Sequence, residues 1–264
     1  MRQQIESIMR EASRIMMEKA PRHIESKEGH ANFVTEADRQ TQEVLQERLL
    51  ALLPGSVVFG EEKDNQPLTD APTWVVDPID GTLNYIHGLA HSAVSVAFLE
   101  GKKALQGYVF NPFRDEFFAA EAGKGAFLNG ERIRVSDTPF ERALVFYGSS
   151  PYKASLVDAT FRAVSRLMKQ TADIRRLGAA ALDLAYMACG RADIFFEYSL
   201  APWDYAAGQL LIEEAGGVFE LLNPEVVTAD FKQSAAVFTS NQPCAGPGLE
   251  IVKGIYEAWQ TDTP

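Results

Sequence analysis

The sequence has few cysteines and few histidines, and neither type is arranged as a disulfide or zinc motif. Only two cysteines occur among its 264 residues, Cys189 and Cys244, and no pairing motif surrounds them. The four histidines have neither HExxH spacing nor the Cys/His spacing of zinc sites. This usage predicts two free thiols in a reducing compartment and argues against a disulfide scaffold.

Positive charge is also scarce. The chain has 25 lysines and arginines against 36 aspartates and glutamates, so its formal net charge is −11 at pH 7. Nucleic acids and anionic membranes bind basic surfaces. The charge balance therefore argues against nucleic acid or membrane as the main partner.

Long hydrophobic runs are absent, and none approaches the length of a membrane-spanning helix. Residues 1–20 instead carry apolar side chains at helical spacing with charges on the opposite face, which predicts an amphipathic core helix and not a signal peptide. The apolar positions are Ile5, Ile8, Met9, Ala12, Ile15 and Met16. We therefore expect a cytoplasmic protein.

The order of apolar and turn segments predicts alternating layers of helix and sheet. A second helix is expected over 36–53, followed by short strands over 56–60 and 73–77. Residues 92–133 have the turn spacing of an antiparallel meander, and strands and helices alternate from about residue 143 to the C-terminal helix. This pattern indicates an α+β or α/β layered sandwich. We expect two closely packed subdomains, 1–140 and 141–264, that together form one catalytic unit.

The segment WVVDPIDGTLNY, residues 74–85, places two aspartates where a buried strand ends. Asp-Pro and Asp-Gly are common turn formers, so the motif alone also fits an ordinary turn. However, the end of a strand is where ligands gather in α/β folds. Asp77, Asp80 and the carbonyl of Ile79 would supply the hard oxygen ligands that suit Mg²⁺.

The residues after these aspartates favour phosphate binding. Gly81 and Thr82 are expected to begin a helical turn, and the first N–H groups of a helix can hold an anion. A cation and a phosphate would then share one site at the end of this strand.

Other acidic segments are weaker when each is taken alone. Asp204 in PWDYAAGQLLIEEAGG fits the first turn of a helix, where the helix dipole favours an acid anyway. Glu61 follows an apolar strand, and adjacent glutamates there are usually solvated. Phe33–Asp38 fits a helix start capped by Thr35. The segment GKGAFLNG lacks nucleotide-binding spacing and fits a hairpin with an Asn-Gly turn.

The joint order of these motifs is much more specific. GEE, then WVVDPIDGTLNY, then LGAAALDLA, then WDYAAGQLLIEEAGG resembles the inositol monophosphatase family of the lithium-sensitive, magnesium-dependent sugar-phosphatase superfamily. The resemblance covers essentially the whole chain. One departure is Ala90, where members often have proline, and it lies beyond the metal loop.

The resemblance implies two or three Mg²⁺ ions per active site. One would be held by Glu61, Asp77 and the Ile79 carbonyl, and a second by Asp77, Asp80 and Asp204, with Asp77 bridging. A third, weaker ion would depend on Glu61 and water. Such an ion set would neutralise carboxylates that otherwise repel one another and raise one another's pKa.

The resemblance also implies roles in the reaction. Thr82, oriented by Asp38, would position with Glu61 a metal-activated water for in-line attack on a phosphate monoester. Lys27 matches a lysine often found near the metals. The residues implied to contact phosphate or substrate are Asp80, Gly81, Thr82, Gly178, Ala179, Ala180, Glu197 and Asp204.

The substrate is less closely defined. The pattern favours myo-inositol monophosphate, but relatives act on fructose 1,6-bisphosphate, NADP, adenosine bisphosphate or histidinol phosphate. Arg175 and Arg176 fit either a site for a second phosphate or salt bridges of a dimer interface, and we favour the second. The resemblance implies a homodimer. A different class of function, a regulatory protein associated with transcription or RNA processing, would retain the same fold.

Overall fold

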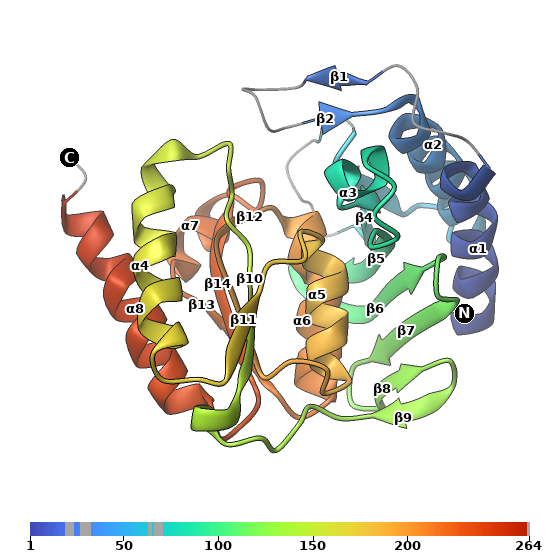
Figure 1. Ribbon diagram of the computed structural model, residues 1–264. Helices are drawn as coiled ribbons and strands as arrows, with labels where there is room; N and C mark the ends of the chain where they lie inside the picture. Colours follow the sequence, from blue (N-terminus) through green and yellow to red (C-terminus); the bar gives the residue numbers. More distant parts are fainter. Residues whose placement is uncertain (19–23, 27–32, 63–64, 66–70, 263–264) are drawn as a thin grey trace.

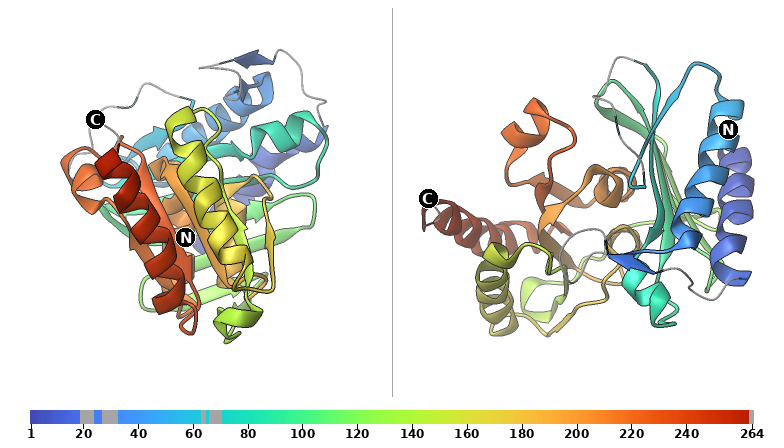
Figure 2. Two further views of the ribbon diagram at one scale, coloured as in Figure 1. Left: turned by 60° about the vertical axis from the view of Figure 1, so that its left-hand side comes forward. Right: turned by 90° about the horizontal axis from the view of Figure 1, so that it is seen from above.

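Alternating layers of helix and sheet build the protein (Figures 1 and 2). The computed structural model describes residues 1–18, 24–26, 33–62, 65 and 71–262, without the side chains of 227–229. In these residues the helices are α1 (Arg2–Glu18), α2 (Glu36–Leu52), α3 (Thr82–Ile86), α4 (Val157–Met168), α5 (Ala180–Ala188), α6 (Pro202–Glu214), α7 (Pro224–Ala229) and α8 (Ala245–Asp262), with 3-10 turns at Phe140–Arg142 and Ala154–Leu156.

The first sheet has seven strands in the order β3-β4-β5-β6-β7-β8-β9. Its first pair, β3 and β4, is parallel, and the other pairs are antiparallel. The strands are β3 (Val57–Gly60), β4 (Thr73–Asp80), β5 (Ala93–Glu100), β6 (Lys103–Asn111), β7 (Glu116–Glu121), β8 (Gly125–Leu128) and β9 (Glu131–Ile133). The predicted meander and its Asn-Gly hairpin are therefore confirmed.

The second sheet has five strands in the order β11-β10-β12-β14-β13. Strand β10 is parallel to β11 and β12, whereas β14 is antiparallel to β12 and β13. The strands are β10 (Leu144–Tyr147), β11 (Asp173–Arg175), β12 (Ile194–Leu200), β13 (Val218–Leu221) and β14 (Ala235–Ser240). A small separate pair joins β1 (Glu25–Ser26) to β2 (Phe33–Val34). The sequence patterns predicted neither this pair nor α7.

Three hydrophobic clusters fill the spaces between the layers. Helices α1 and α2 cover one face of the first sheet, α5 and α6 lie between the two sheets, and α4 and α8 cover the outer face of the second sheet (Figure 2). The amphipathic first helix is confirmed, since Ile5, Met9, Ala12 and Met16 are buried. The alternating layers confirm the predicted sandwich. The division of the chain at residue 140 stays a prediction.

Small residues let α6 approach its neighbours closely. A Cβ on Gly208 would lie 2.6 Å from the Cβ of Leu184 in α5. A Cβ on Gly107 in β6 would lie 2.7 Å from the carbonyl oxygen of Ala207. Distances below 3 Å are not tolerated, so these two positions accept only glycine while the neighbours stay in place.

None of the helices in the described part of the chain combines the length and apolarity that crossing a bilayer requires.

Candidate active site

The end of β4 carries the two aspartates of the central motif. The sequence predicted that this strand ends at Asp77, but it continues to Asp80 with a register shift against β5 between these residues. Both side chains are buried, with exposed fractions of 2% and 4%, as are all the other residues of this strand. Backbone amides orient them, because Ile79 N–H donates to Asp77 Oδ1 at 3.0 Å and Leu182 N–H donates to Asp80 Oδ2 at 3.0 Å.

Gly81 brings the predicted phosphate turn against the predicted substrate wall. Its φ of 80° lies in the left-handed region. A Cβ here would lie 2.9 Å from the Cβ of Ala179 and 3.2 Å from the carbonyl oxygen of Gly178. Helix α3 begins at the next residue, Thr82. Glycine is therefore needed both for the turn and for the close approach of the segment that precedes α5.

Asp38 and Thr82 meet across 44 positions of sequence. Thr82 Oγ1 lies 3.0 Å from Asp38 Oδ1, to which it donates, and 3.1 Å from the carbonyl oxygen of Ile79. The other oxygen of Asp38 accepts from the backbone N–H of Thr35 at 2.8 Å and from the Thr35 hydroxyl. Burial raises the pKa of Asp38, and the hydrogen bonds from Thr35 oppose that rise.

Glu61 and Asp204 come from two other segments. Glu61 follows β3, and its N–H donates to the carbonyl of Val76 in β4 at 3.2 Å. Asp204 lies in the first turn of α6, as predicted, and its Oδ2 accepts from Ala201 N–H at 2.7 Å. The side chain of Asp204 thus caps its own helix while it remains close to the aspartates of β4.

The electrostatics show that these carboxylates act on one another. The pKa of Asp77 is raised well above its ordinary value, first by burial and then by Glu61, Asp80, Asp204 and Asp38. Burial, Glu61 and Asp80 likewise raise the pKa of Asp204. Because each of these causes favours the protonated form, the site holds more negative charge than it can stabilise alone.

This donor chemistry fits a hard divalent cation such as Mg²⁺. Carboxylate oxygens and the Ile79 carbonyl are the ligands such a cation prefers, and its charge would relieve the repulsion. Within the described ranges, no three Asp, Glu, His or Cys side chains are already arranged as a metal site. Each of Asp77, Asp80 and Asp204 instead has one carboxylate oxygen that accepts a hydrogen bond from a backbone amide. The assignment of individual metal ligands therefore stays a prediction.

Glu197, the predicted substrate contact, lies in β12 and is only 8% exposed. Ser150 donates to its Oε1 twice, from the backbone N–H at 3.0 Å and from the hydroxyl at 2.7 Å. Burial raises the pKa of Glu197 to about 7, although the Ser150 hydrogen bonds and Arg176 oppose the rise. Glu197 is also close enough to Asp204 to raise the pKa of that carboxyl.

The two arginines whose role the sequence left open have different surroundings. Arg175 pairs with Asp173 on its own strand, with Nη1 2.6 Å from Oδ2. Arg176 Nε donates to the Ser149 hydroxyl at 3.0 Å, and its charge lowers the pKa of Glu197. Arg176 is thus the one of the two that faces the predicted substrate wall. Lys27 lies outside the described residues.

Several residues near the site were missed by sequence reasoning. Asp183 in α5 is buried, lies 3.1 Å from Nε2 of His91 and raises the pKa of Asp80. The Asn84 amide donates to the carbonyls of His91 and Leu177, both at 2.8 Å. A signal existed for Asp183, because it is the single charged residue in the otherwise apolar helix AALDLAYMA. None existed for Asn84, whose two partners lie in different segments.

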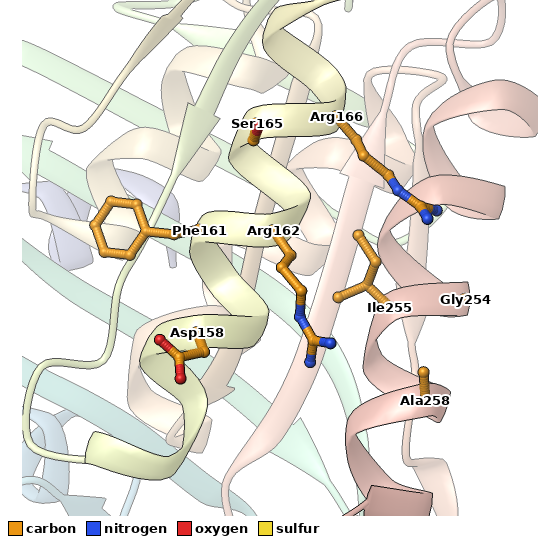
Figure 3. A pocket seen from close by; sticks show the side chains of 8 residues that line it. All are labelled: Asp158, Phe161, Arg162, Ser165, Arg166, Gly254, Ile255 and Ala258. Atoms are coloured by element: carbon orange, nitrogen blue, oxygen red, sulfur yellow. The ribbon is translucent and has the colours of Figure 1, made fainter.

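A large groove lies elsewhere, between α4 and α8 on the outer face of the second sheet (Figure 3). Its volume is about 800 Å³, and the side chains of Arg162 and Arg166 project from α4 into it toward α8. None of the predicted site residues lines this groove. The groove between α4 and α8 and the cluster of carboxylates therefore occupy different parts of the molecule.

Comparison with known proteins decides the family. The model of the inositol monophosphatase family matches residues 1–251. The chain belongs to this family. It is 43% identical over 199 residues to an inositol-1-monophosphatase of Rhizobium meliloti, which covers 73% of each chain. The resemblance found in the sequence is thus confirmed.

The inositol monophosphatase fold is also confirmed. The structure of a Thermotoga maritima IMPase superimposes with a TM-score of 0.84 at 33% identity over 96% of each chain. A relative with a different name is similarly close, since the Nus factor SuhB of Escherichia coli is 41% identical over 195 residues, 73% of each chain. The comparisons therefore leave the specific activity of this family member open.

Proposed function

We propose that the protein is a Mg²⁺-dependent phosphate monoester hydrolase that converts myo-inositol 1-phosphate and water to inositol and phosphate. The observation that supports it most is the mutual charge repulsion of Glu61, Asp77, Asp80 and Asp204 beside the Gly81 turn, in a chain of the inositol monophosphatase family. Mg²⁺ held by these carboxylates and the Ile79 carbonyl would neutralise them and polarise the phosphate as a Lewis acid.

Thr82 and Asp38 are proposed to orient the attacking water. When the Thr82 hydroxyl donates its hydrogen to Asp38 Oδ1, a lone pair of Oγ1 is left to accept a hydrogen bond from water. Asp38 keeps this orientation because Thr35 occupies its other oxygen. Glu61 would receive the proton that the water loses, which is the role of a general base.

The phosphate is proposed to lie at the start of α3 and the leaving group beside Glu197. The first N–H groups of a helix lack helical partners and favour an anion. Glu197 offers an acceptor for the vicinal hydroxyls of a polyol. An inositol ring fits this division of the site into an anion-binding part and a hydroxyl-binding part.

Other substrates remain as alternatives within the same chemistry. Arg176 faces the substrate wall, so a substrate with a second phosphate, such as fructose 1,6-bisphosphate, NADP or adenosine bisphosphate, would gain from its charge. Arg176→Gln should then lower kcat/KM for such a substrate far more than for myo-inositol 1-phosphate. Histidinol phosphate would lack the vicinal hydroxyls that Glu197 is proposed to bind.

A regulatory role is the second candidate. The similarity to the Nus factor SuhB of E. coli favours it, since that relative is about as close as the phosphatase. We also propose a homodimer, as the family resemblance implies. Neither proposal conflicts with hydrolysis by the same chain.

Phosphate release from purified protein tests the proposed function. We expect turnover of myo-inositol 1-phosphate in Mg²⁺, loss of it in excess EDTA, inhibition by Li⁺, and lower kcat/KM for the other four substrates. Asp77→Asn should be inactive, and Asp137→Asn, an exposed aspartate, should behave as wild type. No release from any of the five substrates, together with tight binding to a protein or RNA partner, would support the regulatory role instead.

A further inference from the structure

The loop between β10 and α4 folds around the carboxylate of Glu197. Ser150 supplies two donors to Oε1 of Glu197, at 3.0 Å and 2.7 Å, although the residues are 47 positions apart. Tyr152 extends the same contact, because its hydroxyl donates to the carbonyl of Ser199 at 3.3 Å. The loop is therefore attached to β12 at Glu197 and at Ser199.

The backbone of this loop is specialised for the contact. Ser150 has a φ of 39°, in the left-handed region that residues other than glycine rarely adopt. Gly148 lies so close to Glu197 that a Cβ there would be 1.7 Å from Oε2. Its N–H donates to the carbonyl of Phe196 at 3.0 Å, which fixes the loop to the strand.

The two carboxylate oxygens of Glu197 differ in their hydrogen bonds. In the part of the chain that the structure describes, both hydrogen bonds to this carboxylate end on Oε1. Oε2 is therefore the oxygen that can accept from a ligand. An anchored carboxylate with one open oxygen is what recognition of a hydroxyl group requires.

We propose that Ser150 is a positioning residue that holds Glu197 as an oriented acceptor for the hydroxyls of a polyol phosphate. The inference rests on the proposed function and names the part of the substrate that the site recognises. Ser150 acts through Glu197: its hydroxyl lies closer to Oε1 of Glu197, at 2.7 Å, than to its other acceptor, the carbonyl of Ser199, at 3.1 Å. The loop thus determines which leaving group binds, whereas the carboxylates and Thr82 act on the phosphate.

The charge of Glu197 is part of this recognition. The Ser150 donors favour the ionised carboxylate, and Arg176 does the same, whereas Asp183 favours the protonated form. Asp204 and Tyr152 also lie within electrostatic range of Glu197. Loss of the Ser150 hydroxyl should therefore raise the pKa of Glu197, and the carboxylate form should be recovered at higher pH.

Two variants separate the hydroxyl of Ser150 from its backbone conformation. Ser150→Ala removes only the hydroxyl and retains the strain of the positive φ, whereas Ser150→Gly removes the whole hydroxymethyl side chain and adopts this φ without strain. For myo-inositol 1-phosphate at pH 7, Ser150→Gly should raise KM by up to about tenfold, the largest fall in the ionised fraction of Glu197 that a pKa raised by about one unit can cause. KM for p-nitrophenyl phosphate, which has no hydroxyls to recognise, should change less than twofold. The KM defect should shrink as the pH rises to 8.5.

A measurement without turnover keeps the inference testable if wild type is inactive. Carbon-13 NMR titration of labelled glutamate carboxyls, with the Glu197 signal assigned by Glu197→Gln, should show a pKa about one unit higher in Ser150→Gly. An unchanged pKa, or equal KM increases for both substrates, would overturn the role of Ser150. Failure of wild type to release phosphate from either substrate would instead contradict the proposed function.

Discussion

Replacing Asp77 by asparagine should stabilise the metal-free protein while it abolishes hydrolysis. Asparagine has nearly the same shape and can still accept from the N–H of Ile79. It removes the buried charge that Glu61, Asp80 and Asp204 repel. Relief of a strained functional site commonly adds about 1–2 kcal/mol to the free energy of unfolding. For a chain of this size each kcal/mol raises Tm by about 2–4 °C.

The sign of the effect depends on pH and on Mg²⁺. Because the pKa of Asp77 is raised in the folded protein, wild type is most stable where this carboxyl is protonated, and it loses stability as the pH rises through the folded pKa. The gain in the free energy of unfolding from Asp77→Asn should thus reach its full value above that pKa and vanish near pH 4, the ordinary range of a carboxyl. In saturating Mg²⁺ wild type should be the more stable of the two proteins, since a ligand at 100 times its Kd adds about 2.7 kcal/mol to the free energy of unfolding of wild type.

Thermal unfolding in EDTA and in 10 mM Mg²⁺, with Asp137→Asn as the control, measures these shifts. The control should follow wild type in both conditions, because Asp137 is exposed. A lower Tm for Asp77→Asn than for wild type in EDTA would show that Asp77 does not destabilise the metal-free site by repulsion. A full Mg²⁺-induced rise in Tm in this variant would show that Asp77 does not bind the cation. Near-normal turnover by this variant would contradict the bridging role.

Three further predictions concern single positions. Thr82→Ala should lower kcat about 100-fold or more while the Mg²⁺-induced rise in Tm persists, and loss of both would mean that Thr82 supports the metal site rather than the water. Glu197→Gln should raise KM for myo-inositol 1-phosphate more than for p-nitrophenyl phosphate, and equal effects would remove Glu197 from recognition. Gly208→Ala should cost about 1–3 kcal/mol by urea unfolding because its Cβ would meet Leu184, whereas Gly254→Ala in α8, with open space around it, should not destabilise.

The sequence was sufficient to predict elements whose apolar pattern is regular. The first helix, the antiparallel meander and the start of α6 at Pro202 follow from spacing, turn residues and helix-start chemistry. The end of β4 was predicted less well, because a strand with a register shift has the same local composition as a turn. Short pairings such as β1 with β2 have no periodicity to detect.

For the site, the sequence predicted which acidic residues take part but not what orients them. The family resemblance implied that Asp38 orients Thr82, and the structure shows their hydrogen bond. The contacts of Glu197 with Ser150 and of His91 with Asp183 join segments that are far apart in sequence. Such contacts depend on tertiary packing, so they leave no local pattern in a single sequence. They form only in the folded protein, where the two sheets and α5 pack together.

An anomalous-diffraction map of a crystal grown with Mn²⁺ tests the central claim most directly, because Mn²⁺ accepts the same oxygen ligands as Mg²⁺. The account predicts at least one strong peak between Asp77 and Asp80, within about 2.5 Å of their oxygens, with Glu61 or Asp204 completing the ligands. A map that places Mn²⁺ elsewhere, or leaves these carboxylates without a cation at saturating Mn²⁺, would contradict it.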